Sequence, residues 1–249
     1  FPLTAENDFL PDLDAIPEET ARRAKFIYIN YPNNPTGAVA TKAFYEKLVA
    51  WAKTYEVGVV SDLAYGALGY QGYENPSFLS TPGAKDVGIE FYTFSKTFNM
   101  AGWRLAFAAG NEQMIEALNL IQDHLFVGIF PALQEAGIAA LLDSKSEEAV
   151  AQLNATYDSR RDAFVQAAAK IGWQAFPSRG SFYAWMPVPE GYTSESFADL
   201  LLEKAHVAVA PGKGFGPAGD AYVRIGLLVE PERLVEAVDR IAKLYLFNN

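Results

Sequence analysis

Residues 25–37 read KFIYINYPNNPTG, where an apolar stretch of β-branched and aromatic residues runs directly into a cluster of turn-forming ones. Such a stretch predicts a buried strand over residues 25–31 that ends at Pro32. The asparagines, proline and glycine between Asn33 and Gly37 predict a tight turn. Apolar residues then recur at helical spacing from Thr41, so strand, turn and helix follow one another as in an α/β unit.

The same order continues downstream of this helix. Apolar runs predict strands over residues 57–61 and 89–95, and a further strand is predicted over residues 104–109. Strands that alternate with helices are typical of an α/β fold with a mostly parallel sheet flanked by helices. We therefore expect the first part of the chain to form such a sheet.

The pattern of predicted elements changes after the fourth predicted strand. Helical patterns cover residues 112–125 and 147–170, and shorter elements follow. The predicted short strands are 173–176, 182–186, 207–210 and 222–227, with helices at 194–205 and 231–246. We predict a large α/β portion over residues 1–145 and a smaller C-terminal α+β domain over residues 146–249.

Composition excludes several classes of function. The formal net charge is -10 with no run of Lys or Arg, so we expect neither a nucleic-acid nor an anionic-membrane partner, which both need a basic surface. The chain has no cysteine and only two distant histidines, His124 and His206, which argues against disulfides, metal centres and a Ser-His-Asp triad. No apolar run has membrane-spanning length and no signal peptide opens the chain, so we expect a cytoplasmic protein.

Polar side chains follow three of the predicted strands. Asn34, Asp62 and Lys96 each lie at or just beyond a strand end, where ligands collect in parallel sheets. Taken singly, the lysine is most often a solvated charge and the other two are most often turn or cap residues. With Arg104 nearby, the Lys96 amine is expected to lose its proton more easily and to attack a carbonyl, while the guanidinium can hold a phosphate.

Three motifs in register resemble the fold-type I, class I/II aminotransferase family. Asn33 to Gly37 is similar to the N-P-T-G turn of that family, and Asp62 to Tyr65 is similar to its D-x-A-Y segment. Ser95-Lys96 with Arg104 eight residues on resembles its S-K-x(7)-R signature. The resemblance covers essentially the whole chain and looks most like aspartate, diaminopimelate and methionine-salvage aminotransferases.

The resemblance implies an enzyme that carries pyridoxal 5'-phosphate as a Schiff base on Lys96, its catalytic residue. The implied cofactor-binding residues are Asn34, Asp62, Tyr65, Thr93, Lys96 and Arg104. Among them, Asp62 pairs with the ring nitrogen, whose proton makes the ring a better electron sink. Thr93 and Arg104 hold the phosphate, and Asn34 and Tyr65 bind the phenolic oxygen. Arg224 is the implied anchor of the substrate α-carboxylate.

The resemblance also implies partners. The substrates are an amino acid and a 2-oxo acid, and the intact protein is expected to be a homodimer. Family members carry a long further segment on the amino-terminal side. Residues 1–145 are therefore expected to be part of a large cofactor-binding domain whose N-terminal portion, with part of the phosphate cradle, is absent.

Two alternatives stay open at this point. The chain can be the non-catalytic sensor half of a transcription regulator with the same fold, which carries a basic DNA-binding domain upstream. It can also be a C-S lyase, because the same ring stabilises any Cα carbanion. The intact set of Lys96, Asp62, Tyr65, Arg104 and Arg224 favours an enzyme over a sensor.

Overall fold

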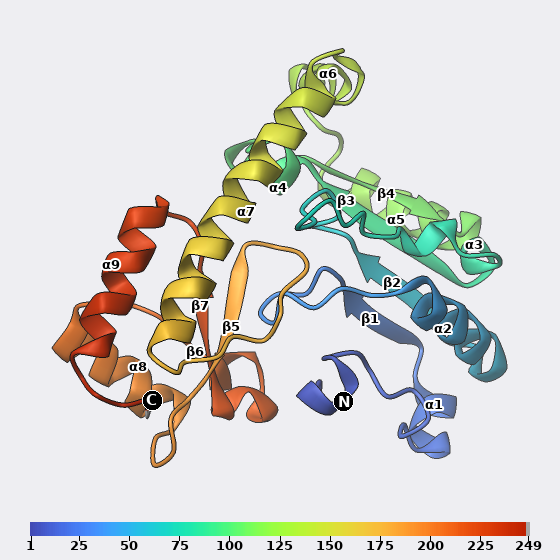
Figure 1. Cartoon of the computed structure of the whole chain (residues 1–249). Coiled ribbons are helices and arrows are strands. Elements are labelled where there is room, and N and C mark those ends of the chain that lie inside the picture. Colours follow the sequence, from blue (N-terminus) through green and yellow to red (C-terminus); the bar gives the residue numbers. More distant parts are fainter. Residues whose placement is uncertain (248–249) are drawn as a thin grey trace.

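A computed structural model describes residues 1–247 (Figure 1). Its first sheet contains β1 (Phe26–Asn30), β2 (Gly58–Asp62), β3 (Gly88–Thr93) and β4 (Ala106–Gly110), in the order β1-β2-β3-β4. β1, β2 and β3 run parallel, and β4 joins β3 antiparallel. The expectation of a mostly parallel sheet flanked by helices is thus confirmed.

Helix α2 (Lys42–Tyr55) covers one face of this sheet. The Thr41 side chain caps it by accepting a hydrogen bond from the Phe44 N–H. Phe44 and Leu48 then pack in one core with Ile27 and Ile29, the inward-facing residues of β1. The Cβ atoms of a strand alternate between the two faces, so one face of β1 is buried by α2.

The other face of β1 corrects the sequence prediction of a wholly buried strand. Phe26 is 51% exposed and Tyr28 is 72% exposed. Helix α5 (Glu112–Leu125) lies on this side, with the Met114 side chain near Gly58. The predicted apolar stripe of α5 is present but remains largely open, since Leu125 is 69% exposed. Only part of this face is covered within the described residues.

The third strand ends two residues earlier than predicted. β3 stops at Thr93, and the single-turn helix α4 (Phe94–Thr97) follows, so Ser95 and Lys96 are helical. The Thr93 side chain accepts a hydrogen bond from the Ser95 N–H, which caps this turn. The cap therefore converts the last residues of an apolar run into a helix start.

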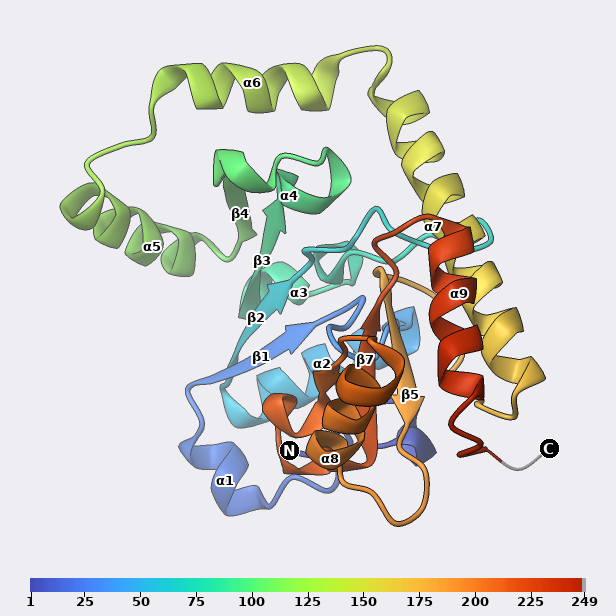
Figure 2. The same ribbon diagram turned by 90° about the vertical axis from the view of Figure 1, so that its left-hand side faces the viewer.

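The second sheet lies beside the first (Figure 2). It contains β5 (Tyr183–Pro187), β7 (Tyr222–Gly226) and the short β6 (Ala210–Pro211), antiparallel in the order β5-β7-β6. Helix α8 (Ser194–Leu200), the π-helical turn Leu201–Ala205 that continues it and α9 (Pro231–Ala242) complete this part. Its core is apolar and includes Trp173, Met186, Phe197, Leu201, Val223 and Val238.

Two predicted strands of this second part are wrong or shortened. Residues 173–176 form no strand, because the Trp173 N–H bonds back to the Ala168 carbonyl at the end of α7 and a single backbone bond, from the Phe176 N–H to the Trp185 carbonyl, does not make a ladder. The strand predicted over 207–210 is reduced to Ala210–Pro211. A short apolar run cannot by itself distinguish a paired strand from an irregular buried segment.

Long helices connect the two sheets. α5 leads into α6 (Pro131–Leu142), which passes α4 and then turns into α7 (Ser146–Lys170) (Figures 1 and 2). α7 lies side by side with α9. The division near residue 146 stays a prediction. Within residues 1–247, every helix is either too short or too polar to span a lipid bilayer.

The N-terminal segment contacts both sheets. After the short helix η1 (Ala5–Asn7), the Phe9 ring packs edge-on against Phe176 at 4.7 Å and Tyr222 at 5.7 Å. Phe9 also belongs to the core under α2. Residues before α1 (Glu18–Arg23) therefore join the two sheets through one apolar cluster.

Candidate functional site

The three polar residues predicted at strand ends lie along one edge of the first sheet. Asn30 and Asp62 are register partners at the ends of β1 and β2, and the Asn30 side chain donates to the Asp62 carbonyl at 2.9 Å. Asp62 is in turn the partner of Phe91 on β3. Because α4 begins just beyond β3, Lys96 leaves the sheet at the same edge as Asp62.

In the turn after β1, the side chains of two neighbouring asparagines bond to different partners. The Asn33 side chain accepts hydrogen bonds from the Thr36 N–H and hydroxyl, so it stabilises the turn. The Asn34 side chain is left free to accept a 2.8 Å hydrogen bond from Arg224 Nη1. Gly37 has φ +70°, and an added Cβ would lie 2.1 Å from Ser178 Oγ. The turn therefore needs glycine there, where it approaches the second sheet.

Arg224 lies between two aromatic rings. Its guanidinium carbon is 4.4 Å from the centre of the Tyr183 ring and 4.7 Å from that of Phe215. Such contacts are favourable and hold the plane of the guanidinium. Tyr183 is the first residue of β5, and Phe215 is the last residue of η5 (Gly212–Phe215). Sequence reasoning missed both residues, because no local pattern connects them with Arg224.

Tyr65 contacts the same group of residues. Its hydroxyl oxygen lies 3.4 Å from that of Tyr183, and its ring packs edge-on against Phe182 at 5.2 Å. Burial raises the pKa of Tyr65, as do its hydrogen bond to Tyr183 and the nearby Asp62, while Arg224 lowers it. Tyr65, Asp62, Tyr183 and Arg224 therefore influence one another electrostatically.

Lys96 reaches this group through Phe182. Its Nζ lies 5.7 Å from the centre of the Phe182 ring, which also contacts Tyr65. Within residues 1–247, Lys96 Nζ takes part in no hydrogen bond and no ion pair. An amine without an anionic partner is available for a covalent or hydrogen-bonding role.

The Asp62 carboxyl is held at the edge of a small pocket. Burial raises the pKa of this carboxyl, and the Ala64 N–H, which donates to Oδ1 at 3.1 Å, partly offsets that rise. The pocket has a volume of about 270 Å³, and its lining includes Tyr28, Asn30 and Asn33. A carboxylate disfavoured by burial gains stability when a cation binds beside it.

The predicted phosphate ligands are less closely assembled. The Thr93 hydroxyl is engaged at the start of α4, 2.9 Å from Ser95 Oγ. Arg104 has φ +53° at the end of η3 (Ala101–Trp103), is exposed, and donates from Nη1 to the Ala101 carbonyl. No hydrogen bond joins Arg104 to Thr93 or Lys96 in the described part of the chain.

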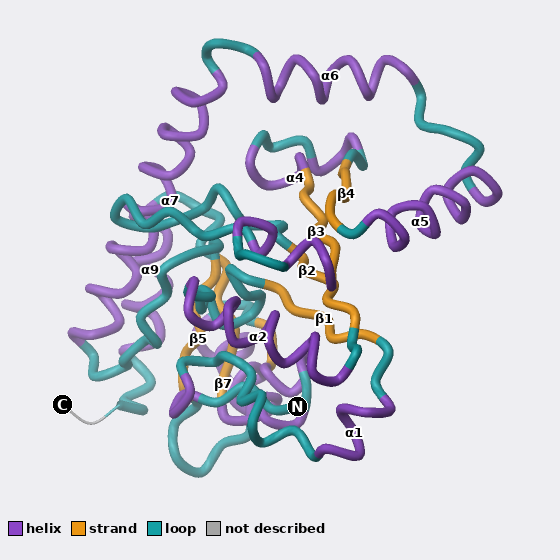
Figure 3. The backbone as a smooth tube through the Cα atoms, turned by 90° about the vertical axis from the view of Figure 1, so that its right-hand side faces the viewer, coloured by secondary structure: helices purple, strands orange, loops and turns teal. Residues whose placement is uncertain are grey.

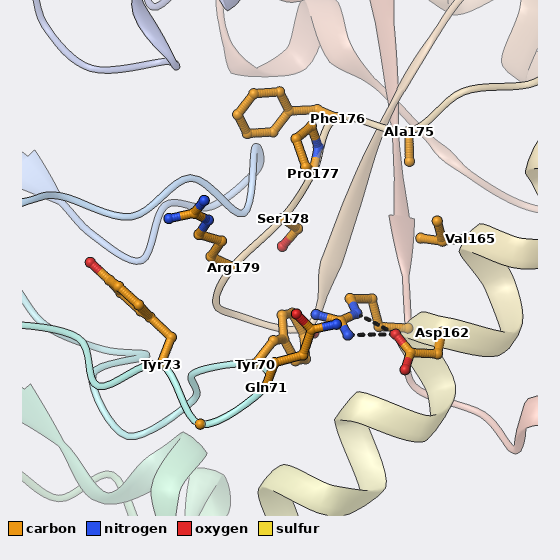
Figure 4. Close-up of a pocket in the computed structure, with 12 residues that line it drawn as sticks. Tyr70, Gln71, Tyr73, Asp162, Val165, Ala175, Phe176, Pro177, Ser178 and Arg179 are labelled. Carbon is orange, nitrogen blue, oxygen red and sulfur yellow. Dashed lines mark hydrogen bonds and ion pairs between the residues drawn. The ribbon is translucent and has the colours of Figure 1, made fainter.

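A larger pocket of about 680 Å³ lies away from these residues (Figure 4). It is formed by the loop 70–73, by Arg161, Asp162 and Val165 of α7, and by residues 175–179. None of the predicted site residues lines it. Its volume therefore does not identify the candidate site, which is defined by the strand ends. In the described residues, no group of three or more His, Cys, Asp or Glu can hold a metal ion.

Comparison with known proteins identifies relatives over nearly the whole chain. The sequence model described as "Aminotransferase class I and II" matches residues 1–241. L-glutamine–4-(methylsulfanyl)-2-oxobutanoate aminotransferase of Bacillus subtilis (strain 168) is 57% identical over 99% of this chain and 61% of its own length. LL-diaminopimelate aminotransferase of Moorella thermoacetica is 49% identical over 98% of this chain and 62% of its own length.

Solved structures agree with the described fold. Substrate-bound BacF from Bacillus subtilis has a TM-score of 0.93 at 47% identity, over 99% of this chain and 62% of that chain. The aromatic aminotransferase from Pyrococcus horikoshii has a TM-score of 0.91 at 33% identity, over 98% of this chain and 65% of that chain. The chain thus spans about three fifths of the length of these relatives.

Proposed function

Because the chain belongs to the class I and II aminotransferase family, we propose that it carries the catalytic residues of a pyridoxal-phosphate-dependent aminotransferase. The reaction moves an amino group between an amino acid and a 2-oxo acid. The observation that carries the proposal is the contact between Arg224 and Asn34. It joins the implied substrate anchor to the turn beside the implied cofactor residues.

The available side chains fit pyridoxal phosphate. The cofactor offers an aldehyde, a basic ring nitrogen, a phenolic oxygen and a phosphate. The chain presents a free amine at Lys96, a carboxyl at Asp62 that gains from a cation, and a hydroxyl at Tyr65. Arg104 is an exposed cation without a carboxylate partner among residues 1–247, which suits a phosphate.

Each side chain then has a role in transamination. The cofactor, when bound, withdraws electrons from the substrate Cα. Lys96 Nζ would hold the aldehyde carbon and, when released by substrate, would move the proton at Cα. Asp62 would keep the ring nitrogen protonated, and Arg224 would bind the α-carboxylate of either substrate through its free N–H groups. Tyr183 and Phe215 would hold the Arg224 guanidinium in place.

We propose glutamine as amino donor and 4-(methylsulfanyl)-2-oxobutanoate as acceptor. The support is the 57% identity with the Bacillus subtilis enzyme of that name, against 49% for the diaminopimelate enzyme. The regulator and lyase alternatives have no such support, since both curated relatives are named aminotransferases. Rates with glutamine, methionine and LL-diaminopimelate compare the candidates, and a preference for LL-diaminopimelate would contradict this assignment.

The central test is Lys96→Ala. This change should abolish the visible absorbance of lysine-bound pyridoxal phosphate together with all amino-group transfer, because no other amine replaces Nζ. Lys42→Ala is a matched control, since Lys42 is an exposed lysine at the start of α2. Absorbance and activity that survive in Lys96→Ala would refute the proposal.

We also propose that the protein acts as a homodimer. Large apolar side chains are exposed along α5, α6 and their connection, including Leu125 at 69%, Phe130 at 69% and Leu142 at 78%. Contiguous exposed apolar surface is typical of an interface. Sedimentation of the protein and its Phe130→Glu variant tests this. A monomeric parent protein would contradict the proposal. The cytoplasmic location stays a prediction.

A further inference from the structure

A carboxylate is buried in the middle of the first sheet. Glu90 lies on β3, is 6% exposed, and has register partners Ser61 on β2 and Ala109 on β4. It accepts hydrogen bonds from Ser61 Oγ at 3.0 Å, Ser77 Oγ at 2.5 Å and the Phe78 N–H at 2.8 Å. Buried carboxylates are rare and are stable only when donors such as these surround them.

These three donors belong to the two ends of one segment. Ser61 is the residue before Asp62 at the end of β2, whereas Ser77 and Phe78 begin at η2 (Phe78–Ser80). The segment between them is mostly loop and extends toward α7 (Figures 2 and 3). Glu90 therefore closes residues 61–78 into a loop, and this loop carries both Asp62 and Tyr65.

Contacts along the rest of the loop do not replace this closure. The Asn75 side chain bonds the Gly66 and Leu68 carbonyls within the loop itself. Asn154 of α7 donates to the Ala67 carbonyl, and the Gln71 N–H donates to Asp158 of α7. The middle of the loop is thus tied to the second part of the chain. Its first end is held to β3 by the β2-β3 ladder and by the Leu63 N–H, which donates to the Phe91 carbonyl at 2.9 Å. Glu90 holds the other end, at Ser77 and Phe78.

Apolar packing alone would not fix the position of the Ser77 and Phe78 end of the loop as narrowly. Phe78 is fully buried and its ring packs on Tyr45 at 5.7 Å, so this region would be compact without a charge. Hydrogen bonds are directional, however, and a satisfied buried polar group specifies one arrangement. Glu90 thereby fixes the Ser77 and Phe78 end of the loop beside Ser61, on the strand that leads directly to Lys96.

We infer that Glu90 is a positioning residue that holds the Ser77 and Phe78 end of the loop, and through the loop Tyr65, at the strand that leads to Lys96. The inference rests on the proposed function only for the roles of Tyr65 and Lys96. The closure of the loop by Glu90 is a property of the chain without cofactor. Amide exchange therefore tests the closure independently of catalysis.

The test compares Glu90→Leu with Glu90→Gln by hydrogen exchange. Glutamine keeps an acceptor for Ser61 and Phe78, and the Ser77 hydroxyl can rotate to accept from its amide, whereas leucine leaves all three donors unpaired. In Glu90→Leu, the amides of residues 63–76 should exchange about tenfold faster or more. In Glu90→Gln they should stay within about threefold of the parent protein.

Amides of the β5-β7-β6 sheet are the internal reference. The control variant is Asp86→Asn, because it removes only the exposed ion pair between Asp86 and Lys53. Unchanged exchange over 63–76 in Glu90→Leu would overturn the inference. Exchange that is faster by the same factor in residues 63–76 and in the β5-β7-β6 sheet would also overturn it, because that result means general loss of stability. If Glu90→Leu does not fold, Ser77→Ala removes only the hydrogen bond from Ser77 Oγ to Glu90. The amides of residues 63–76 should then also exchange faster.

Pyridoxal phosphate itself provides the second measurement. Its affinity should fall about tenfold in Glu90→Leu and recover in Glu90→Gln, since the conservative variant restores the position of the loop that carries Tyr65. An equal fall in both variants would refute a positioning role. If the parent protein and Lys96→Ala bind the cofactor alike, the proposed function fails, while the exchange result still decides the closure of the loop.

Discussion

Arg224→Lys separates the charge of the proposed substrate anchor from its shape. The guanidinium gives Nη1 to Asn34 and lies between Tyr183 and Phe215, which leaves its remaining N–H groups for a carboxylate. A guanidinium binds a carboxylate through two parallel hydrogen bonds, and an ammonium at this site would offer one fewer. A charge-assisted bond contributes about 1.5–3 kcal/mol. Its loss corresponds to about a 10- to 150-fold rise in KM.

Steady-state kinetics of both half-reactions measures this effect. The KM values of the amino acid and the 2-oxo acid should rise by similar factors, because both substrates carry the carboxylate, while cofactor affinity stays within about twofold. Arg179→Lys is the control, since Arg179 lines the separate pocket of Figure 4. Unchanged KM values, or a loss of cofactor affinity in place of substrate affinity, would refute the assignment of Arg224.

Three further changes test the site and its support. Burial raises the pKa of Asp62, so its ionisation lowers the stability of the fold as pH rises through that pKa. At pH 7, Asp62→Asn should therefore unfold at a higher temperature than the parent protein, and this difference should shrink toward pH 4. The variant should nevertheless bind pyridoxal phosphate more weakly. Burial also raises the pKa of Tyr65 above its ordinary value of 10.0, so Tyr65→Phe should lose less stability in urea titrations above pH 10 than the parent does. Trp173 is 1% exposed and packs edge-on against Phe197, so Trp173→Ala should lower the free energy of unfolding in urea by about 3–5 kcal/mol, and a loss below about 1 kcal/mol would contradict the described core.

Local sequence patterns predicted the first sheet well. The strands near residues 26–30 and 58–62 and the helix over 42–55 follow from short-range periodicity and from the capping residue Thr41. Errors arose where a side chain overrode the pattern. Thr93 capped a helical turn inside an apolar run, and Trp173 bonded back to the end of α7 and packed in the core of the second part.

The chain order of residues was enough to predict that Asn34, Asp62 and Lys96 follow strand ends at one edge of the sheet, because consecutive parallel strands end at the same edge. It could not place Tyr183 or Phe215 against Arg224, nor show that Asn34 and not Asn33 bonds Arg224 across 190 residues. Strand ends can be predicted locally, since turns and helix caps depend on residues that are neighbours in the sequence. Contacts between the two sheets depend on how the sheets pack against each other. That packing depends on how much apolar surface both cores bury together, which no short stretch of sequence shows. Sequence alone therefore determined which residues are proposed to be reactive, and the tertiary structure decided which other side chains contact them.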